Sequence, residues 1–122
     1  MVSNTIKAQV AASPRDLNPS GFDMTAGAIV GVIGATYTVL PAISVVLNYS
    51  GSTVTATLPS AASFTNRQLF FCNKGGGAIN SASANVNPLI GGSDGTAILS
   101  ATAGKWAHLV SDGSVWQIVG GN

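Results

Sequence analysis

Residues 106–119 read Trp-Ala-His-Leu-Val-Ser-Asp-Gly-Ser-Val-Trp-Gln-Ile-Val. Two apolar runs, residues 106–111 and 114–119, flank the pair Asp112 and Gly113. A type I′ turn needs positive φ at both central residues, and Asp-Gly is one of the pairs that adopt it. The stretch therefore predicts a β-hairpin turning at Asp112 and Gly113, with Trp106 and Trp116 packed against each other across the two strands.

Toward the N-terminus, short apolar runs follow one another at strand-like spacing. Residues 53–58 alternate threonine with apolar residues, so we expect Val54, Ala56 and Leu58 to face the interior. Further strands are expected at residues 36–40 and 43–47, on either side of Pro41, and at residues 96–100. We predict an all-β domain of short antiparallel strands in a compact sandwich or barrel-like fold.

Residues 68–73 are apolar on both faces of their predicted strand. Such a strand needs cover on both sides. A domain of this size has few layers of its own, so we expect one cover to come from another subunit.

The chain is poor in charge, because only 7% of its 122 residues are Asp, Glu, Lys or Arg, against roughly 25% in ordinary soluble proteins. Glutamate is absent, and the formal net charge is +1. Helices favour long polar side chains on their exposed face, so this composition favours strands. Nothing in the charge points to nucleic acid or to an anionic membrane, and so little charge protects weakly against self-association. We expect neither nucleic acid nor membrane as a partner.

The first 34 residues differ from the rest. Residues 1–23 are polar, contain Pro14 and Pro19, and are expected to form an extended arm; residues 24–34 are a glycine-interrupted apolar bridge. We therefore divide the chain into an arm with its bridging segment, residues 1–34, and a β-domain, residues 35–122. An alternative remains for residues 24–48, which are uncharged and long enough for a membrane span, although Gly34 and Pro41 interrupt them.

Candidate catalytic and metal-binding residues are few. A Cys/His dyad could use only Cys72 and His108, which are the single cysteine and the single histidine. A cation between Asp94 and Asp112 would have one carboxylate from each loop, a poor set of ligands for calcium. The run Lys74-Gly-Gly-Gly lacks the spacing of a phosphate-binding loop. We predict that the chain is not an enzyme and needs neither metal nor cofactor.

Four aromatic residues offer an alternative function. Trp106 and Trp116, with Tyr37 and Tyr49, could together form a surface on which sugars stack. Packing in the core or at a subunit interface is the competing interpretation, and the one we favour.

From Ala35 onward the sequence resembles a β-structured domain of bacteriophage virion proteins, found in tail fibres and in capsid decoration (cement) proteins. The residues that carry the resemblance form short motifs, in order: residues 37–40, 45–48, 54–63, 66–67, 73–77, 91–95 and 109–116. Nothing follows the domain and only the arm precedes it, which departs from the fibre pattern and favours the decoration type.

The resemblance implies a homotrimeric decoration protein of the virion, assembled in the host cytoplasm, that binds the major capsid protein at three-fold sites and stabilises the head. The alternative is a tail-fibre or receptor-binding module that recognises host surface glycans. We assign the arm's contacts with the capsid and the contacts between subunits to two sets of residues. The capsid set is Ile6, Val10, Arg15, Asp16, Leu17 and Phe22, and the trimer interface is Val45, Leu47, Leu69, Phe71 and Trp106.

Overall fold

A computed structural model describes residues 28–122, and all regular secondary structure within that range is β-strand. The strands are β1 Ala28–Val32, β2 Thr36–Thr38, β3 Ile43–Asn48, β4 Val54–Thr57, β5 Gln68–Asn73, β6 Ile79–Ser81, β7 Val86–Asn87, β8 Ala97–Leu99, β9 Trp106–Ser111 and β10 Trp116–Gly121. The all-β prediction is confirmed for these residues.

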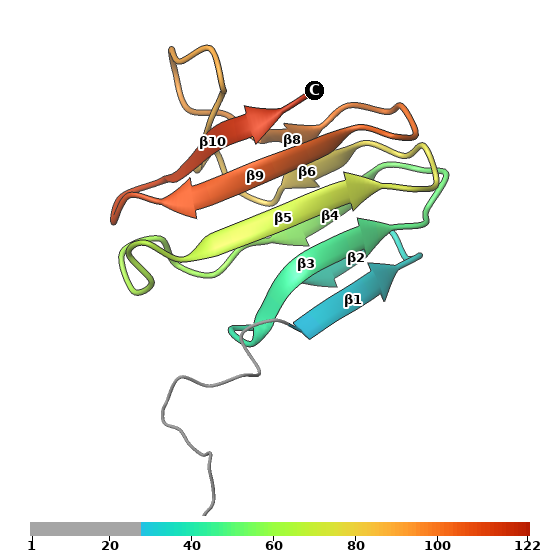
Figure 1. Cartoon of the computed structure of the whole chain (residues 1–122), viewed down its shortest axis with the longest axis horizontal. Coiled ribbons are helices and arrows are strands. Elements are labelled where there is room, and N and C mark those ends of the chain that lie inside the picture. Colours follow the sequence, from blue (N-terminus) through green and yellow to red (C-terminus); the bar gives the residue numbers. More distant parts are fainter. Residues whose placement is uncertain (1–27) are drawn as a thin grey trace, which may run out of the picture.

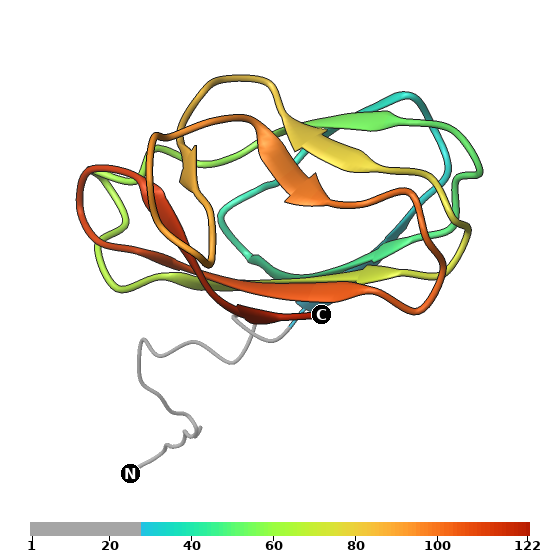
Figure 2. The same cartoon turned by 90° about the horizontal axis from the view of Figure 1, so that it is seen from above.

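The strands form two sheets that face each other across a core (Figure 2). The larger sheet has the order β1-β3-β5-β9-β10-β7, and the smaller has the order β2-β4-β6-β8. In Figure 1 the larger sheet lies in front, with β1 at its lower edge and β10 near its upper edge. The described domain is thus a two-layer sandwich.

The direction of the strands differs from the prediction, which was of antiparallel strands throughout. From β1 to β6 the chain passes from one sheet to the other at every step, so β1, β3 and β5 pair in parallel, as do β2, β4 and β6. Among the strands of residues 28–122, antiparallel pairing joins β5 with β9, β9 with β10, and β6 with β8, and an isolated antiparallel bridge joins Val86 to Gly95. The strands on either side of Pro41, β2 and β3, show this passage between sheets, because β2 belongs to the smaller sheet and β3 to the larger. The connection between them crosses from one layer to the other instead of turning back within one sheet. The alternation of apolar residues predicts each strand but does not indicate which kind of connection the chain makes.

The predicted hairpin forms, but its turn is longer than expected. Trp116 pairs with Ser111, so four residues, 112–115, connect the strands. Only Gly113 in this loop has positive φ, at 92°, whereas a type I′ turn would also need it at Asp112. The Asp112 carboxylate instead accepts hydrogen bonds from the backbone N–H groups of Ser114 and Val115, at 2.8 and 2.9 Å. These bonds hold a wider loop and shift the start of β10 to Trp116.

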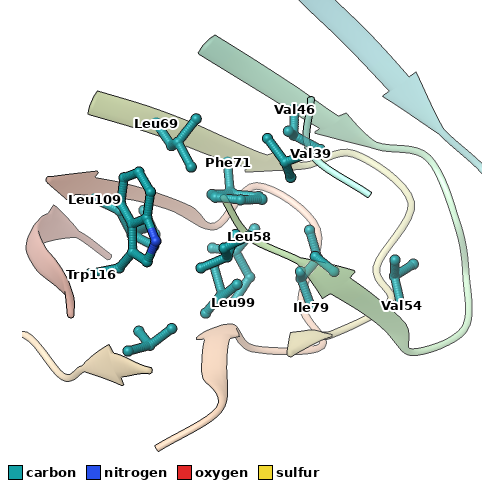
Figure 3. Close-up of a cluster of buried hydrophobic side chains, with 14 of the residues drawn as sticks. Val39, Val46, Val54, Leu58, Leu69, Phe71, Ile79, Leu99, Leu109 and Trp116 are labelled. Carbon is teal, nitrogen blue, oxygen red and sulfur yellow. The ribbon is translucent and has the colours of Figure 1, made fainter. Parts of the chain in front are cut away.

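The core lies between the sheets (Figure 3). Its largest fully buried side chains are Trp116, Phe71, Leu69, Ile79 and Leu109. The prediction that Val54, Ala56 and Leu58 face the interior is confirmed, because all three side chains are buried. Trp106 and Trp116 do not pack across the hairpin: Trp106 pairs with Cys72 at the far end of β9 and is 40% exposed.

Strand β1 belongs to the larger sheet, with Val30 opposite Val46 and Val32 opposite Asn48 on β3. The β-domain therefore begins before Ala35, and the boundary between residues 34 and 35 moves toward the N-terminus. Residues 28–48, the described part of the alternative membrane span, form three strands. Within residues 28–122 no helix is long and apolar enough to cross a membrane.

Two buried asparagines, the last residues of β3 and β5, hydrogen-bond to the turn that follows β5. Asn48 and Asn73 are register partners, and both side-chain amides donate to the carbonyl of Gly77, at 2.8 and 2.9 Å. The turn that follows β5 passes so close to residues 49–52 that a Cβ on Gly77 would lie 2.1 Å from the backbone oxygen of Ser52, and one on Gly75 would lie 2.3 Å from that of Tyr49. The glycine run at residues 75–77 thus has a structural reason, namely close backbone approach.

Candidate interaction surface

The outer face of the larger sheet carries apolar side chains in two rows that cross the strands. One row runs Ile29, Val45, Phe70 and His108 from β1 to β9, as the register pairs show. The next row runs Gly31, Leu47, Cys72 and Trp106. We call this surface the apolar face and define it by its apolar members: Ile29, Val45, Leu47, Phe70, Cys72 and Trp106.

Much of the apolar face is open to solvent. Ile29 is 61% exposed, Trp106 40% and Phe70 37%, whereas Val45 and Leu47 are half-buried by their neighbours in the sheet. Within residues 28–122 no further layer of chain covers this side of the larger sheet (Figure 2). Scattered exposed apolar residues are ordinary, whereas contiguous rows of them across four strands make this face a candidate interaction surface.

The outer face of the smaller sheet has the opposite character. Thr36 pairs with Thr55 and Thr38 with Thr57, and all four of these threonines are exposed. Cross-strand threonine pairs of this kind suit a sheet face in contact with water. The two sides of the sandwich therefore differ: one is suited to solvent, and the other is suited to a partner.

His108 lies at the β9 end of the first row, next to Phe70. Its ring stacks on Phe70, with ring centroids 4.0 Å apart and the planes 14° from parallel. Its Nε2 lies 2.9 Å from the side-chain oxygen of Gln68, within hydrogen-bond distance. The imidazole thus presents a flat ring continuous with that of Phe70, with its polar edge directed to a neighbour on β5.

The residues predicted for the trimer interface divide into two groups. Val45, Leu47 and Trp106 lie on the apolar face, but Leu69 and Phe71 are fully buried in the core and have no surface that a partner could touch. The strand at residues 68–73 is apolar on both faces, as predicted, yet its outward residues are Phe70 and Cys72. The sequence analysis placed Leu69 and Phe71 on the outer side of this strand, which is its inner side in the structure. It did not include Phe70 or Ile29 among the outward residues. The alternation of residues along 68–73 does not indicate which set of side chains faces the core, because the side chains on both sides of the strand are largely apolar.

The predicted capsid contacts, Ile6, Val10, Arg15, Asp16, Leu17 and Phe22, lie outside the described residues.

Cys72 and His108 lie on adjacent strands of the apolar face, in neighbouring rows. The histidine is engaged by Phe70 and Gln68, and Cys72 is half-buried beside Trp106. The structure shows no hydrogen bond between the thiol and the imidazole, and the hollow of about 340 Å³ that Cys72 lines with Lys74, Lys105 and Trp106 does not include His108. This arrangement favours packing by both side chains over nucleophilic chemistry.

The two carboxylates considered for a cation are each satisfied by nearby donors. The side-chain amide of Asn87 donates to Asp94, and that of Gln117 donates to Asp112, at 2.9 and 2.8 Å. The hydrogen bond from the Val115 N–H, followed by those from Gln117 and from the Ser114 N–H, lowers the pKa of Asp112 below its usual value. Among residues 28–122 no group of three or more His, Cys, Asp or Glu side chains comes together as metal ligands.

The four aromatic residues considered for sugar stacking do not share a surface. Trp116 is fully buried and donates its Nε1–H to the carbonyl of Pro59 at 2.9 Å. Tyr37 packs half-buried against the core, and this burial raises the pKa of its hydroxyl. Tyr49 is 52% exposed and its ring lies against Gly31, which shares a row of the outer face with Trp106 but lies three strands away from it. The sugar-stacking surface built from all four is therefore not assembled.

Comparison of the sequence with protein-family models and with curated proteins gave no match.

Proposed function

We propose that this chain is a structural subunit that associates with copies of itself through the apolar face, and that the assembled form is a trimeric decoration protein of a phage capsid. The observation that carries the proposal is the contrast between the two sides of the sandwich. A monomer gains nothing from leaving Ile29, Phe70 and Trp106 in water on the side opposite a threonine-covered face. Burying apolar side chains stabilises an assembly by roughly 25 cal/mol for each Å² removed from water.

The low charge of the chain supports self-association over a charged partner. The described residues carry three cationic side chains, Arg67, Lys74 and Lys105, and two acids, Asp94 and Asp112. None of these five lies in the two rows of the apolar face, although Lys74 and Lys105 line a hollow together with Cys72 and Trp106 at the end of the second row. Three such faces can therefore meet around a three-fold axis with Lys74 and Lys105 left at one end of the contact, so that no unpaired charge is desolvated at its centre.

The resemblance to phage virion domains supports placing the assembly on a capsid. In this proposal three subunits present three N-terminal segments at once, so modest contacts with the major capsid protein combine through high effective concentration. Avidity of this kind needs no catalytic residue, cofactor or metal.

The test compares binding to empty phage heads. We expect the wild-type chain to saturate heads at discrete sites. A variant combining Arg15→Ala, Leu17→Ala and Phe22→Ala should keep the molar mass of the wild-type oligomer, because the apolar face is intact. It should lose binding to heads, because the proposed arm contacts with the capsid are removed. Thr55→Ala, on the threonine-covered face, is the matched control and should bind as the wild type does.

Unchanged head binding by the triple variant would contradict the assignment of the arm. Binding to host cells but not to heads would favour the tail-fibre alternative over the decoration protein.

A further inference from the structure

The larger sheet has an incomplete edge beside β10. Strand β7 pairs with β10 only at Trp116 and Gln117, after which Pro88 follows and the chain leaves the sheet. Within residues 28–122, residues 118–121 of β10 therefore have a strand neighbour on one side only, namely β9. The smaller sheet ends nearby at β8, which pairs with β6 alone. Unpaired edges of this kind accept a further strand.

A hollow runs along this incomplete edge, between β10 and β8. It consists of two adjoining parts, of about 500 and 230 Å³. Both parts are lined by the same central residues: Leu89, Ile98, Leu99, Ser100 and Ile118. Leu89 is 54% exposed at the rim, and no charged side chain lines either part. We call this hollow the edge groove; its shape and lining suit an extended apolar segment in the place where β7 would have continued.

We propose that the edge groove receives residues 5–11 of a neighbouring copy of this chain as an added strand. This segment reads Thr-Ile-Lys-Ala-Gln-Val-Ala, so Ile6, Ala8 and Val10 fall on one side of a strand and Lys7 and Gln9 on the other. The apolar side matches the lining of the edge groove, and the polar side is left to face water. The backbone groups of the segment complete the hydrogen bonding of residues 118–121.

The length of chain before β1 allows this contact. Residues 12–27 connect the segment to β1 and can extend to roughly 50 Å at about 3.3 Å per residue. The six strands of the larger sheet span roughly 24 Å at about 4.8 Å per strand. The connection is therefore long enough to leave the β1 edge of one copy and reach the β10 edge of the next.

The position of β1 favours a neighbouring copy over the same chain. Strands β1 and β10 lie near opposite edges of the larger sheet (Figure 1). The direct route from β1 to the edge groove of the same chain crosses the apolar face that the proposed function places between subunits. A head-to-tail arrangement brings one copy's β1 edge toward the next copy's β10 edge, and such heterologous contacts close into a trimeric ring when successive copies are related by a rotation of one third of a turn.

This inference rests on the proposed self-association and refines the arm within it. Ile6 and Val10, which the sequence analysis assigned to the capsid, are assigned here to the edge groove of a neighbour. Arg15, Leu17 and Phe22 remain the proposed capsid contacts.

Site-directed cross-linking tests the exchange in the full chain. A Cys72→Ala background leaves no other thiol and keeps this position of the apolar face apolar, and its molar mass is first compared with that of the wild-type chain. Ile6→Cys with Leu89→Cys then places one thiol on each side of the proposed contact. A short bis-maleimide should link different chains and produce species up to a covalent trimer on a denaturing gel. The matched control, Lys7→Cys with Leu89→Cys, directs the first thiol away from the groove and should cross-link at least several-fold less.

Light scattering before cross-linking separates the two proposals. A trimer that forms no links between chains, or that links Ile6→Cys and Lys7→Cys equally, would overturn the strand exchange and leave the trimer standing. Links confined within single chains would overturn it as well. A monomer before cross-linking would overturn the self-association on which the inference depends.

Discussion

Asp112 shows how one side chain determines a turn. Its carboxylate accepts hydrogen bonds from the N–H groups of Ser114 and Val115 and from the side-chain amide of Gln117. These donors favour the ionised form and lower the pKa of Asp112. Sequence reasoning located this turn correctly because Asp-Gly is a strong signal. The loop has four residues instead of the predicted two. The Asp112 carboxylate accepts hydrogen bonds from Ser114 and Val115, and the Asp-Gly pair alone does not predict these bonds.

The turn should make stability depend on pH in a defined direction. The folded pKa of Asp112 is below the unfolded value of about 3.9, so the carboxylate's contribution is fully present above that pH and is lost as the pH falls through the folded pKa. Asp112→Asn should therefore lower the free energy of unfolding at pH 7, and its difference from the wild type should shrink below about pH 4.

Thermal unfolding of both proteins across this pH range, at one protein concentration, measures the effect. Thr55→Asn, an exposed change without a titrating group, is the control, and its difference from the wild type should not vary with pH. A constant difference for Asp112→Asn would contradict the assigned role.

At the scale of elements, β3 and β5 depend on buried amides where they end. Asn73 donates to the carbonyls of Gly77 and Ser100, both at 2.9 Å, and accepts from the N–H of Gly76 at 2.7 Å. Strands 68–73 and 53–58 could be predicted from alternation and apolar content. The asparagines could not, because an asparagine at a strand end is equally typical of an exposed turn, and only the neighbouring strand reveals that Asn48 lies beside Asn73.

Asn73→Ala should lower the free energy of unfolding by about 2 kcal/mol, because the partly buried carbonyl of Ser100 and N–H of Gly76 lose their partner, whereas the carbonyl of Gly77 keeps Asn48. Asn87→Ala is the matched control: that amide also makes two hydrogen bonds, to Gly92 and Asp94, but they are exposed, so we expect a loss within about 0.5 kcal/mol. Urea denaturation of the two variants at the same protein concentration measures the difference. Equal losses would contradict a structural role for the buried pair.

At the scale of the whole molecule, two sheets with unlike outer faces suggest a subunit and not a solitary domain. The sandwich could be predicted from the spacing of strands, but its parallel pairing depends on connections that cross between layers. The interaction surface could be predicted only in part. Val45, Leu47 and Trp106 lie on the outer face of the larger sheet, whereas Leu69 and Phe71 were assigned to the wrong face of β5, because Phe70 and Cys72 are also apolar. In such a strand, tertiary packing alone selects the inward set.

The central claim is that the apolar face holds copies of this chain together, and the molar mass in solution tests it most directly. Light scattering should give three times the 12.2 kDa chain mass for the wild type and for Thr55→Asp, whose new charge lies on the threonine-covered face. Phe70→Asp places a charge at the centre of the apolar face and should give the mass of one chain, because an unpaired charge at a buried contact is strongly unfavourable. A wild-type chain that stays at 12.2 kDa, or a Phe70→Asp variant that keeps the trimer mass, would contradict the account.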